Sequence, residues 1–431
     1  MKCIQCGTDN NLRDRTGNQG RCKNCNHPFA FEPTSMGKLK ITDPFFAKAI
    51  ADISANNTLY FTPKQLLYLL DKRQKRRGLV NSLFLYLFWN VWAIGFFGGF
   101  LVGIIGKLSF IVVAIIVNII FMVRFYRASQ SSELNYQQRQ NNAKNLKIIG
   151  GLLLGIGIIT SLAFDSFPIF VVSVLLGMLS IYLGTRPTKP QAEISQSFLF
   201  SQNHFQEWLN RWKQVNGQIP KILPSPREES TPTLVSPEVS AYSFDRLVVC
   251  DSAAISQLLI ANNFHFENNC AVLSITGYPQ SIFSTVMDML RRNPELKVYA
   301  LHDATPRGVG LLHHLRSSSS WFENSNVAIF DLGLLPRQLF SSRKVFVQSS
   351  DASAQAAKQL PAPVREQLST EELEWLESGK FVELESFTPQ KLMQVVTQGI
   401  AGSRNLDLES EDSSLILVGD SGSVYASDSF G

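Results

Sequence analysis

Four long apolar runs without charged residues constrain this chain more than any other feature. They read GLVNSLFLYLFWNVWAIGFFGGFLVGIIG, LSFIVVAIIVNIIFMV, IIGGLLLGIGIITSLAF and SFPIFVVSVLLGMLSIYLGT, and all lie between residues 78 and 185. A helix that crosses a bilayer needs about 20 mostly apolar residues. Buried helices of a soluble core are the alternative, but four consecutive runs of this kind do not favour it. We predict four membrane-spanning helices at about residues 79–103, 108–126, 146–164 and 167–185.

Basic residues are distributed unevenly around these four runs, and they favour the cytoplasmic side of a membrane. One set lies before the first run, between the second and third, and after the fourth: Lys72, Arg73, Lys75, Arg76, Arg77, Arg124, Arg127, Arg139, Lys144, Lys147, Arg186 and Lys189. The two opposite loops carry only Lys107 and Asp165. We therefore expect two helical hairpins in a prokaryotic plasma or internal membrane, with both termini in the cytoplasm. The spans lack an ionisable residue at mid-bilayer, which favours anchoring over transport.

Four of the six cysteines form one N-terminal pattern, Cys3-x-x-Cys6 followed by Cys22-x-x-Cys25. Structural zinc takes four tetrahedral ligands and favours thiolates. The sequence therefore predicts a zinc ribbon over residues 1–35, with a short β-hairpin between the two cysteine turns. An electron-transfer iron site and a redox dithiol are the alternatives. The opening MKCIQCGTDNN lacks the apolar core of a secretory signal, so we expect none, and the cysteine usage suits a reducing compartment.

The predicted ribbon gives little indication of its partner. His27 follows the last cysteine, and we interpret it as a surface residue because four thiolates complete the site. Much of the net charge of +5 comes from basic residues that flank the apolar runs. The few basic residues of the ribbon do not form a phosphate-binding stripe. Besides the lipid bilayer we therefore expect an unknown protein partner, in preference to nucleic acid.

Composition divides the remaining soluble segments. Residues 43–77 and 195–216 show apolar residues at helical spacing, and Thr62 before Pro63 is a predicted N-cap. Residues 217–243, rich in Pro, Ser and Thr, indicate a flexible linker. The last residues, 401–431, are acidic and rich in Ser and Gly, which predicts a disordered tail.

Short apolar runs alternate with helical patterns from residue 246 onward. The runs are RLVVC, CAVLSIT, KVYALHD and NVAIFDLG. This alternation predicts a mostly parallel sheet that helices cover on both faces. Ligands of such sheets bind beyond the carboxyl ends of the strands. The acids at those ends, Asp251, Asp303 and Asp331, are therefore the candidate catalytic residues.

Three stretches of this region resemble the Toprim domain found in the A subunit of topoisomerase VI and in its meiotic relatives. They are GYP after the second strand, VYALHDATPRG at the third, and VAIFDLGLLPRQL after it. The resemblance covers residues 244–345 and implies an α/β Toprim fold. Residues 346–400 indicate a helical extension. In that family a Glu ends the first strand, the third strand ends in Asp-x-Asp-Pro-x-Gly, and these carboxylates hold magnesium during DNA strand transfer.

The family's metal-binding pattern is incomplete in this chain. Its first Asp falls on Asp303, and the following Pro and Gly also match. Its second Asp falls on Thr305, and its Glu falls on Cys250. Magnesium is usually held by one or two carboxylates plus substrate phosphate. One matching acid, assisted by Asp251 or Asp331, makes a doubtful magnesium site.

The family cleaves DNA with a tyrosine on a helix-turn-helix-like domain that precedes the Toprim domain. The membrane block and the linker take that place here, so we do not expect cleavage of the topoisomerase type. Asp303 can instead cap the helix that begins at Pro306, and Arg307 beside it is a candidate phosphate contact.

Two further residue types have structural interpretations. Cys250 and Cys270 are expected to be small buried apolar groups. His302, His313 and His314 lack a ligand-like spacing and are expected on the surface or within helices.

The sequence thus predicts a multi-domain membrane protein with a zinc ribbon, a four-helix transmembrane block and a Toprim-like domain. The favoured function is binding of a partner at the membrane, in a scaffolding or regulatory role without catalysis. One alternative is a membrane-tethered, magnesium-dependent phosphoryl-transfer enzyme or nuclease. A second is a small transporter or channel with regulatory soluble domains.

Overall fold

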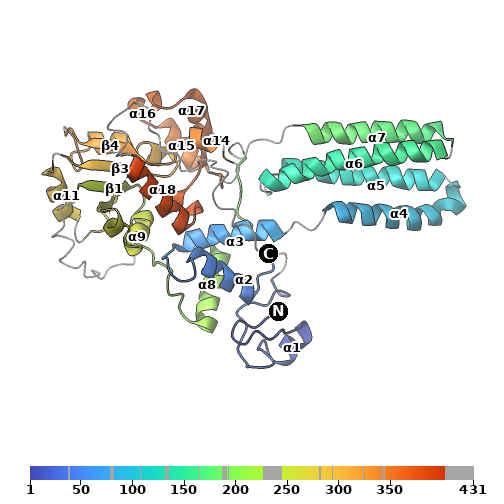
Figure 1. Ribbon diagram of the computed structural model, residues 1–431, viewed down its shortest axis with the longest axis horizontal. Helices are drawn as coiled ribbons and strands as arrows, with labels where there is room; N and C mark the ends of the chain where they lie inside the picture. The colour runs from blue at the N-terminus through green and yellow to red at the C-terminus, as the bar shows by residue number, and fades with distance from the viewer. Residues whose placement is uncertain are drawn as a thin grey trace. The chain divides into compact units, whose positions relative to one another are not determined.

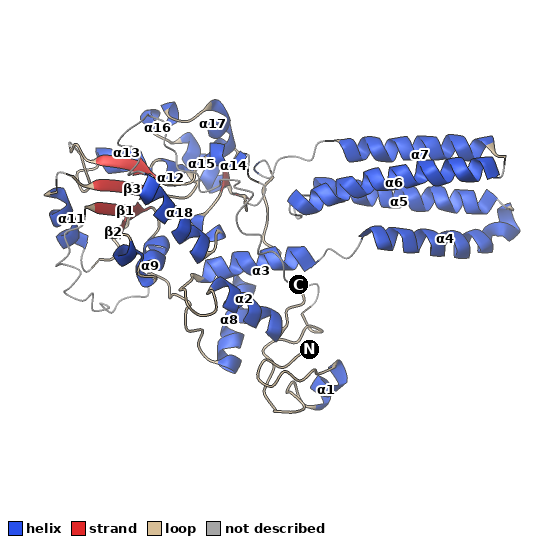
Figure 2. Ribbon diagram, viewed as in Figure 1, coloured by secondary structure: helices blue, strands red, loops and turns tan. Residues whose placement is uncertain are grey.

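Two units make up the chain in the computed structural model (Figures 1 and 2). One combines Met1–Arg73 with Phe198–Gly431, and the other is Gln74–Ser197. The structure describes residues 1–36, 39–77, 82–106, 108–131, 134, 136–163, 165–186, 192, 194–226, 245–280, 283–293, 295–323, 325–340, 342 and 345–402. Most of the predicted linker and nearly all of the predicted tail lie outside these residues.

The unit Gln74–Ser197 contains four long helices that run side by side (Figure 2). They are α4 (Ser82–Ile105), α5 (Leu108–Gln130), α6 (Tyr136–Ala163) and α7 (Phe167–Thr185). Each is long and apolar enough to cross a membrane. Helix α6 begins earlier than the predicted start at residue 146, because the preceding QQRQNNAKN is rich in residues that tolerate or favour a helix.

Close backbone approach holds α6 and α7 together. A Cβ atom on Gly150 would lie 2.7 Å from the carbonyl oxygen of Gly177, and one on Gly157 would lie 2.1 Å from the Cβ atom of Ser173. Small residues at such positions allow two helix backbones to pack closely, which is a common way for helices to associate in lipid. The second predicted hairpin is therefore tightly packed.

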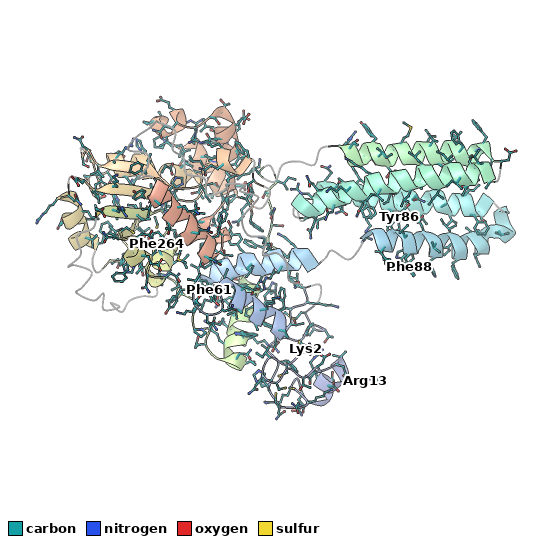
Figure 3. The ribbon with its side chains drawn as sticks, in the orientation of Figure 1. Lys2, Arg13, Phe61, Tyr86, Phe88 and Phe264 are labelled. Carbon is teal, nitrogen blue, oxygen red and sulfur yellow. The ribbon has the colours of Figure 1, made fainter. Side chains whose placement is uncertain are left out.

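A polar network connects α4 and α5. The Tyr86 hydroxyl donates to Asn118 Oδ1 at 2.6 Å, and Asn118 Nδ2 donates to Asn90 Oδ1 at 3.1 Å. Tyr86 is buried, whereas Phe88 on the same helix is 52% exposed (Figure 3). This polar network is thus enclosed within the bundle, beside buried apolar residues such as Met122 and Phe125.

The N-terminal module, residues 1–36, differs in one respect from the prediction. Each Cys-x-x-Cys pair lies in a turn that one antiparallel bridge closes. Between the turns the chain forms helix α1 (Leu12–Gly17) in place of the predicted β-hairpin, so that prediction was wrong. Asn11 and Asp14 make a reciprocal capping box, which satisfies backbone groups at the helix start and favours a helix here.

The module continues into a helical core formed by α2 (Asp43–Ile53), α3 (Pro63–Arg77) and α8 (Gln202–Asn216). The helix predicted over residues 195–216 begins only at Gln202, because the Ser201 side chain caps it. The backbone N–H groups of Ala30 and Phe31 both donate to the buried carboxylate of Asp43 at 2.9 Å. The module is thereby tied to α2.

Aromatic side chains fill this helical core. The ring centroids of Phe31 and Phe46 lie 5.1 Å apart, and those of Phe46 and Trp212 lie 5.0 Å apart. Phe61, labelled in Figure 3 just before α3, is fully buried. Its backbone pairs with the segment after α8, because Leu223 N donates to Phe61 O at 2.9 Å. The helices on either side of the four long helices therefore share one core.

The C-terminal α/β region has the parallel sheet that the sequence predicts. Its strands are β1 (Arg246–Cys250), β2 (Ala271–Ser274), β3 (Lys297–Leu301) and β4 (Ala328–Asp331), in the order β2-β1-β3-β4. All three pairings are parallel. Nearly every residue of β1, β2 and β3 is buried, so both faces of these strands are covered, whereas β4 at the edge of the sheet is partly exposed.

Helices and two short strands complete this region. They are α9 (Ala253–Ala261), α10 (Phe264–Glu267), α11 (Phe283–Arg291), α12 (Pro306–Val309), α13 (Leu311–Ser317), α14 (Pro336–Phe340), β5 (Gln348–Ser349), α15 (Asp351–Lys358), α16 (Ala362–Glu366), α17 (Thr370–Glu377), β6 (Lys380–Phe381), the 3-10 helix η3 (Leu384–Ser386) and α18 (Pro389–Gly402). The segment predicted as a helical extension thus also contains the antiparallel pair β5–β6.

The chain after β6 returns to the carboxyl end of β3. Ala304 N donates to Val382 O at 2.9 Å, and Val382 N donates to Ala304 O at 3.2 Å. This contact joins residues far apart in sequence and brings Glu383 and Glu385 to the edge of the sheet where Asp303 lies. We call this region the acidic edge and define it by Asp251, Asp303, Glu383 and Glu385.

Candidate functional site

The four N-terminal cysteines converge on one point. The Sγ atoms of Cys3 and Cys25 lie 3.6 Å apart, as do those of Cys6 and Cys22. All four Sγ atoms lie within 4.8 Å of one another. Tetrahedral zinc with Zn–S bonds of about 2.3 Å places its sulfur atoms about 3.8 Å apart. The geometry therefore fits a four-thiolate metal site.

Hydrogen bonds at Cys6 and Cys22 lower the pKa of these thiols and favour the thiolate form, whereas burial and the neighbouring cysteines raise the pKa of Cys25. The Thr8 hydroxyl lies 3.3 Å from Cys6 Sγ, and hydrogen bonds from the Thr8 side chain and backbone lower the pKa of Cys6 to about 5. Asn10 Nδ2 donates to Cys22 Sγ at 3.5 Å. Such outer contacts orient metal ligands. His27, half-buried, instead pairs through Nε2 with Asn216 Oδ1 at 3.0 Å, so it does not join the site.

Asp251 and Asp303 meet at the carboxyl ends of neighbouring strands, as the sequence predicts for a parallel sheet. Asp303 N donates to Asp251 Oδ2 at 2.9 Å. The second oxygen of Asp251, Oδ1, is buried and has no hydrogen-bond partner among the described residues. Burial raises the pKa of Asp251 above its ordinary value. Burial and the charge of Asp251 together raise the pKa of Asp303 well above its own.

Asp303 does not cap the helix that begins at Pro306, so that interpretation was wrong. Thr305 is the N-cap, and its hydroxyl accepts from Gly308 N at 3.0 Å. Thr305 directly precedes the helix in an extended conformation, which brings its short side chain to that N–H group. The carboxylate of Asp303 instead accepts from Leu384 N at 2.6 Å. Its role in the fold is therefore to hold the returning chain.

Asp331 lies with His302, which the sequence analysis expected on the surface or within a helix. His302 is only 1% exposed, and its Nε2 lies 3.0 Å from Asp331 Oδ1. Its Nδ1 lies 2.9 Å from the carbonyl oxygen of Asp303. Burial opposes a charge on the imidazole, but the charge and hydrogen bond of Asp331 outweigh it and raise the pKa of His302 to about 9. His302 is buried because it directly follows the carboxyl end of β3, and it does not lie in a surface helix.

This buried pair predicts a pH-dependent stability. In the folded protein the pKa of His302 is about 9, which is higher than its ordinary value of 6.5. Its contribution to the free energy of unfolding is therefore complete below pH 6.5 and is lost as the pH rises through 9. The contribution amounts to about 3 kcal/mol. We expect the thermal midpoint of the solubilised protein to fall over this pH range, and Asp331→Asn to flatten the fall. Equal slopes for the two proteins would contradict the assignment.

The remaining candidates occupy ordinary positions. Arg307 is exposed on α12, and its contact with a phosphate stays a prediction. His313 and His314 lie on α13. Cys250 and Cys270 are fully buried, as expected for small apolar groups.

No pattern in the sequence predicted the residues that α3 and its N-cap contribute to the acidic edge. Lys64 Nζ lies 2.6 Å from Glu383 Oε1 and 3.8 Å from Glu385 Oε2. The Tyr68 hydroxyl donates to Glu383 Oε2 at 2.5 Å, and the Thr62 hydroxyl donates to Glu385 Oε1 at 2.7 Å. More than 300 residues separate these partners in sequence, and no local pattern indicates their contact.

The acids of this edge do not fit a magnesium site. Magnesium requires hard oxygen ligands around one point. Asp303 holds Leu384 N, Asp331 holds His302, and Thr305 brings no carboxylate. Within the residues that the structure describes, the N-terminal cysteines alone form a group of three or more His, Cys, Asp or Glu side chains gathered closely enough for an ion.

Comparison with known proteins identifies the C-terminal region. Residues 247–400 match the family model of the Toprim domain shared by Spo11 and the A subunit of topoisomerase 6. The match continues past the predicted boundary at residue 345, in accord with the return of the chain to Ala304 at Val382. No curated protein and no solved structure matches the chain. The α/β region of this chain, which ends with α18, is therefore a Toprim domain of the type found in Spo11 and topoisomerase 6.

Proposed function

We propose that this protein is a membrane-anchored binding protein with a scaffolding or regulatory role, and that its Toprim domain does not cleave DNA. The four candidate membrane helices expose many large apolar side chains, among them Val91, Phe100 and Leu162, each more than 70% exposed. Water-soluble proteins rarely expose contiguous apolar surface of this extent. A bilayer is the environment that covers it.

The distribution of basic residues supports an orientation with both termini in the cytoplasm. Lysines and arginines precede the first candidate helix, lie between the second and third, and follow the fourth. The positive-inside rule places these three segments in the cytoplasm. A reducing cytoplasm also keeps thiols available for metal binding. In this proposal Cys3, Cys6, Cys22 and Cys25 hold a zinc ion, which when bound cross-links the N-terminal module.

One observation carries the proposal for the Toprim domain: Asp303, the matching acid of the family's metal motif, accepts a backbone hydrogen bond from Leu384 at 2.6 Å. The motif's second acid is replaced by Thr305, which caps α12. The motif therefore supports the fold and not an ion. Because the described acids of the acidic edge do not gather around one point, they do not support a contact to nucleic-acid phosphate through a divalent ion, and a protein is the favoured partner.

Activity assays distinguish this proposal from a magnesium-dependent phosphoryl-transfer enzyme. We expect the purified full-length protein with added magnesium or manganese to leave supercoiled DNA, single-stranded DNA, RNA and nucleoside triphosphates unchanged. Asp303→Asn should give the same result as the wild type. Metal-dependent turnover that Asp303→Asn abolishes would overturn the proposal. A relative of known nuclease activity run in parallel controls for the assay conditions.

A further inference from the structure

The first half of α3 docks on the acidic edge through a connected set of hydrogen bonds. Lys64 and Tyr68 lie four positions apart on one face of α3, Thr62 directly precedes the helix, and each contacts Glu383 or Glu385. Residues four positions apart in a helix are neighbours on its surface. The three side chains therefore act as one binding surface.

Neighbouring contacts enclose this surface. Gln65 Nε2 donates to Phe387 O at 3.0 Å, and Gln348 Nε2 donates to Glu383 Oε2 at 3.2 Å. The ring centroid of Tyr68 lies 5.1 Å from the ring centroids of both Phe198 and Phe346. Packing of this kind fixes the side chains around the charged pair, which is the condition for an ion pair to contribute to stability.

A second contact anchors the segment before α3. Asn262, at the end of α9, donates through Nδ2 to Tyr60 O at 3.1 Å and accepts from Tyr60 N at 2.8 Å. The chain that enters α3 is therefore held on the Toprim domain at two places. The docking of α3 is a built interface and not one isolated salt bridge.

Lys64 supplies positive charge to the acidic edge. It lies within ion-pair distance of two of the four carboxyl groups there, those of Glu383 and Glu385. Burial raises the pKa of the other two, Asp251 and Asp303, and also that of Glu385, above their ordinary values. Burial opposes a charge on Lys64, but the charge and hydrogen bond of Glu383 outweigh it and raise the pKa of Lys64 above its ordinary value. The ammonium group is therefore held charged.

We propose that Lys64 is a built-in cation, whose ammonium group pairs with Glu383 and Glu385 and thereby locks α3 on the Toprim domain. Helix α3 ends at Arg77, and the first candidate membrane span begins at Phe84. The lock thus fastens the Toprim domain to the segment that leads into the membrane. This inference goes beyond the proposed function, because the lock is independent of what the protein binds.

A cavity gives small ions access to the lock. It has a volume of about 460 Å³, and its lining includes Thr62, Lys64, Gln348 and Glu385. The Lys64 side chain is 37% exposed. An ion added to the solution can therefore reach Glu385, but in the wild type it has to compete with an ammonium group that the chain itself supplies.

Hydrogen exchange of the full-length protein tests the lock through peptides covering residues 60–68 and 380–388. We expect Lys64→Met to increase exchange in both peptides by about tenfold, because the largely buried Glu383 loses its ion-pair partner. Lys64→Arg should preserve protection. Lys48→Met, which removes an exposed lysine of α2, is the matched control. Peptides from β1 and β3 report whether the Toprim core remains folded.

A double variant completes the test. Glu383→Gln combined with Lys64→Met should lose less protection than the two single changes together. Exchange in Lys64→Met equal to that in Lys48→Met would overturn the proposal. Additive losses in the double variant would also overturn it. Turnover assays are separate, so failure of the lock and failure of the proposed function are distinguishable.

Discussion

Replacement of Cys22 by serine is expected to unfold the N-terminal module and to remove its metal. The module has a small core of its own, in which Cys3, Cys22 and Phe29 are the buried members. Structural zinc contributes about 10–16 kcal/mol to peptides of this kind at neutral pH. Loss of one thiolate therefore removes most of what holds residues 1–36 together.

The measurement combines metal analysis with limited proteolysis. Wild-type protein should carry one zinc ion per four-cysteine site, and Cys22→Ser should lose it and become cleavable within residues 1–36. His27→Ala is the control and should retain both metal and protection, because His27 pairs with Asn216. Iron in place of zinc, or an intact module in metal-free Cys22→Ser, would contradict the assignment.

Gly308→Ala is expected to destabilise the Toprim domain strongly. A Cβ atom at this position would lie 2.1 Å from the carbonyl oxygen of Asp303, which is backbone and cannot move aside. Forcing such a contact costs about 3 kcal/mol or more, through displacement of the turn that follows β3. The same turn positions Asp303 against Leu384, so the change also loosens the acidic edge.

Gly310→Ala provides the matched control two residues along. Its Cβ atom would lie 3.5 Å from the nearest carbonyl oxygens, an ordinary van der Waals distance. We expect the thermal midpoint of the Gly308→Ala protein to fall well below that of Gly310→Ala, which should stay near the wild type. Equal midpoints would show that the turn tolerates a side chain. The result also separates a structural role of the Pro-x-Gly motif from a catalytic one.

Local patterns predicted the elements of this fold well. The four apolar runs became α4 to α7, and RLVVC and KVYALHD became the parallel neighbours β1 and β3. Both features depend on residues close in sequence, where apolar periodicity is informative. The capping box that Ser369 and Glu372 form at the start of α17 likewise depends on residues close in sequence.

Contacts between residues far apart in sequence determine the features of the site that the sequence did not predict. Asp303 was interpreted as a helix cap because the helix lies next to it, but its true partner, Leu384, is 81 residues away. His302 lacks a ligand-like neighbour in sequence and nevertheless pairs with Asp331 across two strands. Lys64 is an ordinary helix residue until the fold places it beside Glu383. None of these contacts leaves a periodic signal.

The shared core of α3 and α8 has a consequence for the four long helices that lie between them in sequence. Leu66 and Leu70 before these helices, and Trp208 and Trp212 after them, belong to the same hydrophobic cluster. The transmembrane candidate block is thus inserted between two halves of one folded body. Domain insertions of this kind leave the packing of the host intact. None of the described residues of the cluster belongs to α4 to α7, so the interior of the host is built without them.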